Sequence, residues 1–203
     1  MHIAIIGTGN VGGALATQWS KTGHQIQLGV KDINQFKGKE LLQNDNTRAL
    51  FITEAAALSE VILLAIPPVA IDDVLPLMGD LTGKVVIDAT NSINNQVHGH
   101  PTLFHYLAAQ TKADLVKCFN STGFENMLHP IYPTGPLDMF MAGDNQRAKT
   151  IAHQLALDCG FGSCIDFGKS DKVELLEKFA LCWINLAIMQ GIGRGIGWKL
   201  VRR

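Results

Sequence analysis

The chain has 203 residues, of which 47% are hydrophobic and 17% charged, and its formal net charge is −1. This length suits one domain with a large core, and the near-neutral charge argues against a nucleic-acid partner held by a basic face. No apolar run approaches the roughly 18 residues of a membrane span, so we expect no membrane-spanning helix. The first residues lack the features of a signal peptide, so we expect no signal peptide. The four scattered cysteines predict reduced core thiols and a cytoplasmic protein: Cys118, Cys159, Cys164 and Cys182.

The first 30 residues carry the most specific pattern. Residues 2–6 form an apolar run typical of a buried strand, and a G-x-G-x-x-G sequence follows directly. Residues 13–21 then have helical apolar spacing, and residues 25–30 resemble a second strand. This order of strand, glycine turn, helix and parallel strand is typical of a dinucleotide-binding unit, and it favours that interpretation over an ordinary tight turn.

Each glycine of the motif has a physical role. Gly7 permits the tight turn, Gly9 lets a pyrophosphate approach the backbone, and Gly12 lets the helix pack on the strand. The free N–H groups at the helix start face the phosphates, and two neighbouring side chains can add donors. The predicted phosphate-binding residues are Gly7, Thr8, Gly9, Asn10, Val11 and Gly12.

The end of the second predicted strand bears on the choice of cofactor. NAD sites usually place a carboxylate there, but this chain has Val30, followed by Lys31. A lysine attracts the 2′-phosphate of NADP(H), and one charge-assisted hydrogen bond is worth roughly 1.5–3 kcal/mol. Val30 and Lys31 therefore predict NADP(H). Two alternatives are a solvated loop lysine and a ribose contact from Asp32.

The remaining pattern alternates strands with helices and predicts a Rossmann-type, doubly wound, mostly parallel α/β sheet with right-handed crossovers. One domain, residues 1–203, accommodates all of it. Strands are expected at 49–53, 61–66, 84–89, 115–119, 137–143 and 163–167, and helices at 54–59, 71–78, 146–157 and from Asp171 onward.

Three loops at the carboxyl ends of predicted strands are candidates for ligand contacts, because ligands bind at that edge of such sheets. Their sequences are Ala65-Ile66-Pro67-Pro68, Thr90-Asn91-Ser92 and Asn120-Ser121-Thr122-Gly123. We expect Ala65, Ile66, Pro67 and Asn91 to contact the cofactor. For each loop alone, an ordinary turn explains the same residue types equally well.

The C-terminal segment, residues 171–203, combines a helix with a glycine-rich tail. The helix is apolar nearly all round, which predicts burial on most sides, in the core or against a second copy in a homodimer. The glycines of residues 191–197 follow no strand, so they do not form a second dinucleotide turn. They predict a close approach of backbone to a planar ligand or to another element.

Several kinds of catalytic site find no support in the sequence. His98, His100 and His105 have no matching carboxylate or cysteine nearby, so no metal site is predicted. The nucleophile, zinc-protease and P-loop motifs do not occur, no residue stands out as a general base, and the catalytic residues stay unassigned. Hydride transfer between two stacked rings fits this pattern, because the protein then supplies mainly position and electrostatics.

Over most of its length the chain resembles the NADPH-dependent reductases of the deazaflavin coenzyme F420 and their bacterial relatives. The resemblance rests on residues 6–12, 29–31, 64–67, 88–91 and 117–127, and on the C-terminal helix with its tail. It implies NADP along the strand ends and a deazaflavin or other small-molecule acceptor stacked on the nicotinamide, near Asn120, Thr122 and Gly193. It also implies a dimer formed by the C-terminal segment. The chain departs from the family where the reductases have a small hydroxyl residue and two arginines, because it has Val30, Lys31 and Asp32.

The leading hypothesis is therefore an NADPH-dependent oxidoreductase that passes hydride to a deazaflavin or flavin-like acceptor. A reductase of a small carbonyl or imine compound is a second possibility, since one fold serves many chemistries, but it needs a proton donor. A third is an NADP(H)-binding sensor without catalysis.

Overall fold

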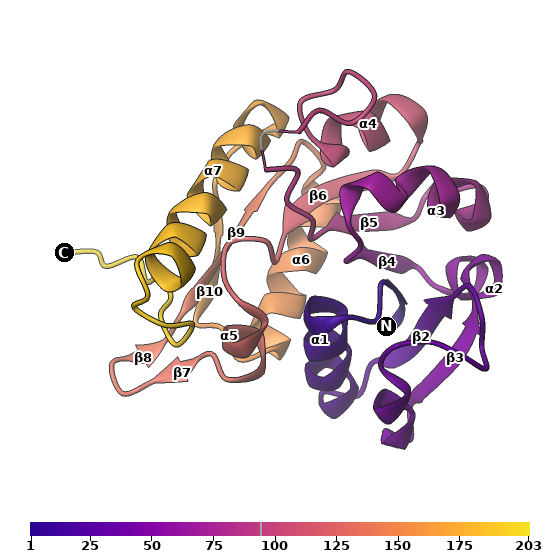
Figure 1. Cartoon of the computed structure of the whole chain (residues 1–203), viewed down its shortest axis with the longest axis horizontal. Helices are drawn as coiled ribbons and strands as arrows, with labels where there is room; N and C mark the ends of the chain where they lie inside the picture. Colours follow the sequence, from indigo (N-terminus) through magenta and orange to yellow (C-terminus); the bar gives the residue numbers. More distant parts are fainter. Residues whose placement is uncertain (94) are drawn as a thin grey trace.

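The computed structural model of the chain describes residues 1–93 and 95–203. Its centre is an eight-stranded sheet in the order β10-β9-β6-β5-β4-β1-β2-β3 (Figure 1). The strands are β1 His2–Ile6, β2 Gln25–Val30, β3 Thr47–Phe51, β4 Val61–Leu64, β5 Val85–Asp88, β6 Asp114–Cys118, β9 Asp138–Ala142 and β10 Ser163–Asp166. All neighbouring strands pair in parallel except β6 and β9. This confirms the Rossmann-type, mostly parallel sheet.

Helices cover both faces of the sheet, which explains why its strands are continuous apolar runs. On one face, Ile3 and Ile5 pack with residues of α1 Asn10–Lys21 and α6 Gln146–Asp158. On the other face, Ala4 and Ile6 belong to the core formed with the remaining four longer helices. These are α2 Ile52–Leu58, α3 Ile71–Met78, α4 Leu103–Gln110 and α7 Val173–Ile184.

Short elements connect the main layers. The 3₁₀ turns are η1 Lys39–Gln43, η2 Pro68–Ala70 and η3 Ser170–Lys172, and a short helix, α5 Phe124–Leu128, follows the loop after β6. A hairpin of β7 Ile131–Tyr132 and β8 Gly135–Pro136 leads from α5 to β9. Helix α4, helix α5 and the hairpin were not among the predicted elements.

The mostly parallel sheet has one antiparallel pair. After β6 the chain passes through α5 and the hairpin without crossing the sheet, so β9 returns antiparallel to β6. Strand β10 then pairs in parallel with β9. The carboxyl ends of β1 to β6 therefore share one edge of the sheet, while β9 and β10 end at the opposite edge. Predicted segment boundaries elsewhere agree with the structure to within three residues; the third strand, expected at 49–53, is Thr47–Phe51.

The C-terminal helix is less buried than the sequence predicted. It is α-helical over α7 and continues as a π-helical turn, η4 Asn185–Met189. Leu175 is 52% exposed and Met189 is 73% exposed, although Leu176 and Trp183 are buried. Within the single chain the helix is thus not buried on most sides, because one apolar side faces away from the sheet, and its predicted burial against a second copy stays a prediction.

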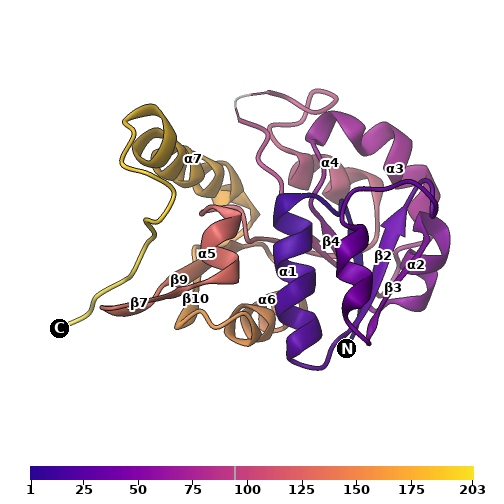
Figure 2. The same ribbon diagram turned by 60° about the horizontal axis from the view of Figure 1, so that its bottom comes forward.

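The tail beyond η4 runs back along the hairpin (Figure 2). The backbone N–H of Asp138 donates to the Trp198 carbonyl at 2.9 Å, and the Lys199 ammonium donates to the Pro136 carbonyl at 3.1 Å. A Cβ on Gly197 would lie 2.2 Å from Leu137, which confirms close backbone packing at that glycine.

The cysteine prediction holds for three of the four thiols. Cys118, Cys159 and Cys164 are buried, and burial raises the pKa of the Cys118 and Cys159 thiols. Cys182 is exposed, because it lies on the uncovered side of α7. Across residues 1–93 and 95–203, every helix is too short or too polar to cross a membrane.

Candidate dinucleotide and acceptor site

The glycine motif forms the turn that the sequence predicts. Gly7 has φ +103°, and a Cβ there would lie 2.3 Å from the Ala65 carbonyl oxygen. A Cβ on Gly12 would lie 1.9 Å from the Gly7 carbonyl oxygen, so β1 and α1 approach too closely for any side chain. A Cβ on Gly9 would meet nothing within 4 Å. The turn is thus packed below and open above Gly9, as a pyrophosphate cradle requires.

The start of helix α1 suits an anion. Its N-cap, Gly9, has no side-chain cap, and its first turn has no acidic residue. The N–H groups of that turn and the positive end of the helix dipole are therefore available to phosphate. The Thr8 hydroxyl donates to the Lys37 carbonyl, and the Lys37 ammonium donates to Asn10 Oδ1 at 3.3 Å. Lys37 thus brings a cation to the turn, and it was not among the predicted site residues.

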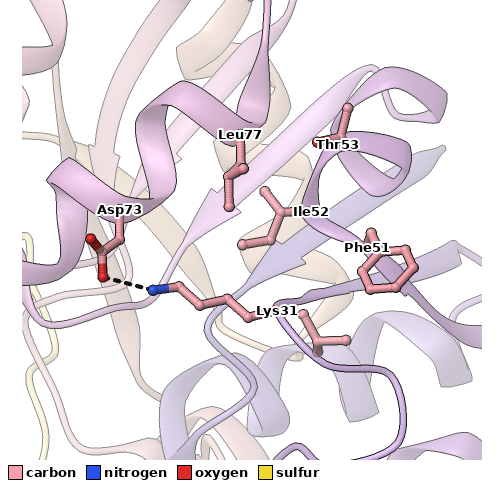
Figure 3. A pocket seen from close by; sticks show the side chains of 7 residues that line it. Lys31, Phe51, Ile52, Thr53, Asp73 and Leu77 are labelled. Atoms are coloured by element: carbon pink, nitrogen blue, oxygen red, sulfur yellow. Dashed lines mark hydrogen bonds and ion pairs between the residues drawn. The ribbon is translucent and has the colours of Figure 1, made fainter.

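The residues after β2 border a cavity of about 560 Å³ (Figure 3). Its lining comes from the ends of β2 and β3, the start of α2 and helix α3: Val30, Lys31, Phe51, Ile52, Thr53, Asp73 and Leu77. The Lys31 ammonium donates to Asp73 Oδ2 at 2.8 Å, and both side chains are more than half exposed. The hydrogen bond from Lys31, and then its charge, lower the pKa of Asp73. The predicted 2′-phosphate ligand thus already has an anionic partner.

Asp32, the alternative ribose ligand, is engaged in a local turn. Its Oδ1 accepts from the backbone N–H of Asn34 at 2.8 Å. The side chain is exposed and does not line the cavity beside Lys31. The geometry therefore favours Lys31 over Asp32 as the polar group at the end of β2.

Two of the strand-end loops are joined by their asparagines. Asn91 Nδ2 donates to the Asn120 carbonyl at 3.0 Å, and Asn120 Nδ2 donates to Asn91 Oδ1 at 3.0 Å. Asn120 follows Phe119, which has the left-handed φ of +62° that is uncommon for a bulky residue and often marks a functional turn. The structure thus brings together Asn91, a predicted cofactor residue, and Asn120, a predicted acceptor residue. The Ala65 N–H binds the Ile6 carbonyl at 2.9 Å, which places the third loop beside the glycine turn.

Thr122 connects to the tail through a residue that the sequence analysis missed. Asn126 is buried, and its Nδ2 donates to Thr122 Oγ1 at 2.7 Å and to the Ile196 carbonyl. The Tyr132 hydroxyl donates to Asn126 Oδ1 at 2.6 Å. Burial, and then the Glu125 charge, raise the pKa of Tyr132. Asn126 is therefore the point where loop, hairpin and tail meet.

The tail is also fixed by its arginine. The Arg194 guanidinium lies 5.5 Å from the Phe124 ring centre and 5.4 Å from that of Trp183, within cation–π range, and it pairs with Glu125. Gly193 itself is exposed, has φ +99°, and would meet nothing within 4 Å as an alanine. Its predicted acceptor contact stays a prediction.

The histidines of the α4 region have local partners. His98 Nε2 lies 2.7 Å from Asp72 Oδ1, and His105 Nδ1 lies 2.8 Å from the Thr102 hydroxyl. In the part of the chain that the structure describes, no three histidine, cysteine or acidic side chains gather closely enough to hold a metal ion.

Comparison with known proteins points to one family. Residues 2–92 match the model of the family described as coenzyme F420-dependent NADP oxidoreductase. Over 93% of both chains, this sequence is 24% identical to the F420-dependent NADP reductase of Methanocaldococcus jannaschii. The family model thus matches somewhat less than half of the chain, and the reductase from Methanocaldococcus jannaschii resembles it over nearly the whole length. These similarities agree on one class of activity, that of an NADP-dependent oxidoreductase.

Two further matches relate the chain to one solved structure and one curated protein. A solved structure from Arthrobacter sp. FB24, assigned as an F420-dependent NADP reductase, superposes with a TM-score of 0.86, 23% identity and full coverage of both chains. A glycerol-3-phosphate dehydrogenase [NAD(P)+] from Thermoanaerobacter is 29% identical over 106 residues, 46% of this chain. That match spans only 32% of the dehydrogenase, so the chain corresponds to about a third of that protein's length.

Proposed function

We propose that this enzyme transfers a hydride between NADP(H) and a deazaflavin, such as coenzyme F420, or a flavin-like ring. The observation that carries the proposal is the chemistry at the edge where β1 to β6 end. The loops there offer backbone N–H groups, amides and hydroxyls, while the nearby carboxylates are already paired, Asp88 and Glu177 with Lys117 and Glu125 with Arg194. Hydride transfer between stacked rings needs positioning and no separate acid or base.

Each part of the edge then has one role toward the dinucleotide. The open turn at Gly9 and the start of α1 hold the pyrophosphate, with Thr8 and Lys37 beside it. Lys31 binds the 2′-phosphate in the cavity that Phe51 borders. The loop at residues 65–67 and Asn91 contact the nicotinamide half, whose ring supplies the hydride when bound.

The acceptor is proposed to bind over the nicotinamide, beside Asn120 and Thr122, with the tail near Gly193. Support comes from the direct bonds between Asn91 and Asn120, which put the two predicted sites next to each other. The family match and the relative from Methanocaldococcus jannaschii favour F420 as the acceptor class.

We further propose that residues 1–203 act as one domain and that residues 171–203 form a homodimer contact in the cytoplasm. Leu175, Cys182 and Met189 recur every seven residues along the C-terminal helix, and all three are exposed in the single chain. An exposed apolar row on a helix is typical of a surface that a second copy covers. Sedimentation at micromolar concentration should show twice the 22.0 kDa mass.

A reductase of a small carbonyl or imine compound is the second candidate, and the partial match to a glycerol-3-phosphate dehydrogenase favours it. It would need a proton donor beside the nicotinamide. The Tyr132 hydroxyl is connected to Thr122 through Asn126. It already donates its hydrogen bond to Asn126 Oδ1, so it does not point its proton at a substrate. A sensor that binds NADP(H) without turnover is the third candidate.

The deciding experiment is anaerobic oxidation of NADPH with purified F420 as acceptor, with NADH in parallel. Saturable transfer from NADPH, and much slower transfer from NADH, is the expected result. Transfer from NADH alone would keep the chemistry and reject the role of Lys31. Binding of NADPH with no transfer to F420 would reject the acceptor and move the search to flavins, small carbonyls and the sensor.

A further inference from the structure

A buried ion cluster lies beneath the loops that meet the proposed nicotinamide half. Lys117 on β6 is fully buried, and its ammonium donates to Asp88 Oδ2 on β5 at 2.9 Å and to Glu177 Oε1 on α7 at 2.6 Å. Asp88 is also fully buried, and Glu177 nearly so. Asp88 and Lys117 are direct neighbours in the register of β5 and β6. Three segments distant in sequence thus converge on one ammonium.

Both carboxylates also hold the loop that follows β5. Asp88 Oδ1 accepts from the backbone N–H of Thr90 at 2.9 Å and from its hydroxyl at 2.7 Å. Glu177 Oε2 accepts from the backbone N–H of Ser92 at 2.8 Å. Asn91, the residue between these two anchors, is half-buried and carries the amide that meets Asn120. The conformation of this short loop is therefore set from both ends by the ion cluster.

Stability alone is a poor explanation for such a cluster. A buried ion pair costs desolvation that its attraction repays only in good geometry, and apolar residues of similar volume are often equally stabilising. What apolar residues cannot do is accept hydrogen bonds from the Thr90 and Ser92 backbone, which would otherwise be buried without partners. The cluster thus gains its value from fixing a loop at the functional edge.

We propose that Glu177 is a positioning residue through which the C-terminal helix sets Asn91 for the nicotinamide half of the cofactor. The inference rests on the proposed function, because it assumes that NADP(H) binds along this edge. In a doubly wound sheet the strands beyond β1 toward β4 and β5 serve the second mononucleotide, whereas β2 serves the adenosine half. Glu177 should therefore affect one end of the dinucleotide and leave the other end alone.

Glu177→Gln separates these roles, because its side chain keeps only one acceptor oxygen. Facing the Lys117 ammonium, the amide turns its oxygen toward the lysine and its NH₂ group toward the N–H of Ser92. Two donors then oppose each other, and the anchor of Ser92 is lost while the contact with Lys117 remains. Glu174→Gln is the matched control, since Glu174 lies one turn earlier on the same helix and is exposed.

The test is titration of the purified protein with NADPH and with 2′,5′-ADP, which carries only the adenosine half. For Glu177→Gln we expect the Kd for NADPH to rise about tenfold, as loss of one buried anchor implies, and the Kd for 2′,5′-ADP to stay within about twofold. The fluorescence lifetime of bound NADPH should shorten as its nicotinamide becomes less ordered. Glu174→Gln should match the unmodified protein in all three measurements.

The outcomes separate this inference from the proposed function. Failure of the unmodified chain to bind NADPH would reject the proposed function itself. The positioning role would be overturned if the unmodified chain binds NADPH normally but Glu177→Gln changes the affinities for NADPH and 2′,5′-ADP equally, or changes neither. If Glu177→Gln does not fold, Thr90→Val takes its place, because it removes a donor to Asp88 and leaves the three charges intact. The same selective loss for NADPH, of smaller size, is then required.

Discussion

The two halves of the functional edge are shaped by different means. At β1 the loop is formed by backbone alone, since Gly7 and Gly12 sit where a Cβ would overlap a carbonyl oxygen. At β5 and β6 the loops are formed by side chains, through Asp88, Lys117 and Glu177 beneath them. The first half needs only neighbours in sequence, whereas the second needs a helix nearly 90 residues away.

This difference predicts where each half is vulnerable. Sterically determined turns fail when volume is added, and polar networks fail when one partner is removed. It also separates binding from positioning: the pyrophosphate cradle at the glycine turn exists without the C-terminal helix, but the loop at Thr90–Ser92 depends on it. Substitutions in each half provide direct tests of this contrast.

The largest effect on stability is expected from Lys117→Met. Removal of the ammonium leaves two buried carboxylates facing each other, and breaking a buried pair costs about 3–5 kcal/mol of unfolding free energy. Urea denaturation followed by circular dichroism measures the loss. Lys112→Met, at an exposed lysine, should change the unfolding free energy by less than about 0.5 kcal/mol. A loss of similar size in both variants would show that the cluster does not stabilise the fold.

The same contrast explains which features the sequence could predict. The glycine turn and the alternation of strands with helices follow from local patterns, because each depends on neighbours that are close in sequence. The antiparallel β9 could not be predicted, since α5 and the hairpin carry no signal for their direction across the sheet. The cluster left a faint trace, a lysine within the apolar run Leu115–Phe119 and a glutamate beside Leu176 on the buried side of a helix.

Side-chain partners across the site were equally hidden from the sequence. Lys31 was predicted from its place after β2, but Asp73 lies 42 residues further on and meets it only because α3 packs beside that strand end. Asn126 likewise joins Thr122 to Ile196, 70 residues away. Such contacts join residues that are far apart in sequence. They form only in the folded chain, and neither residue type nor spacing predicts them.

A smaller effect is expected from Gly12→Ala. The new Cβ would lie 1.9 Å from the Gly7 carbonyl, so α1 must shift, and overpacking of this kind costs about 1–3 kcal/mol. The displaced helix start should also weaken NADPH binding at least about tenfold, since several phosphate contacts move together. Urea denaturation and NADPH titration measure the two effects.

Gly13→Ala is the matched control for that variant. Its Cβ would lie 3.8 Å from the nearest side-chain atom, which is ordinary contact, and replacement of glycine within a helix gains up to about 1 kcal/mol. The adjacent substitutions should therefore have opposite signs. If both variants were destabilised, the loss of stability would come from any added side chain at the start of α1 and not from the close contact between Gly7 and Gly12.

The smallest expected effect concerns the choice between NADPH and NADH, and it lies at the exposed end of the site. Lys31→Ala should weaken NADPH binding about tenfold, the lower end for a charge-assisted bond, and leave NADH unchanged. Asp73→Asn should strengthen NADPH binding about two- to threefold, because it frees Lys31 for the 2′-phosphate and removes a repelling charge. Titration of both cofactors into each variant measures the ratio.

The pH dependence of that ratio gives a further check on the pair. Lys31 lowers the pKa of Asp73, so the carboxylate is charged at neutral pH and the pair is lost only as the pH falls through that lowered pKa. The advantage of Asp73→Asn should accordingly be constant between about pH 7 and 8, where the 2′-phosphate, whose second pKa is about 6, is also charged. An advantage that vanished within this range would assign the effect to another group, whereas weaker NADPH binding by Asp73→Asn would make Asp73 a cofactor ligand in its own right.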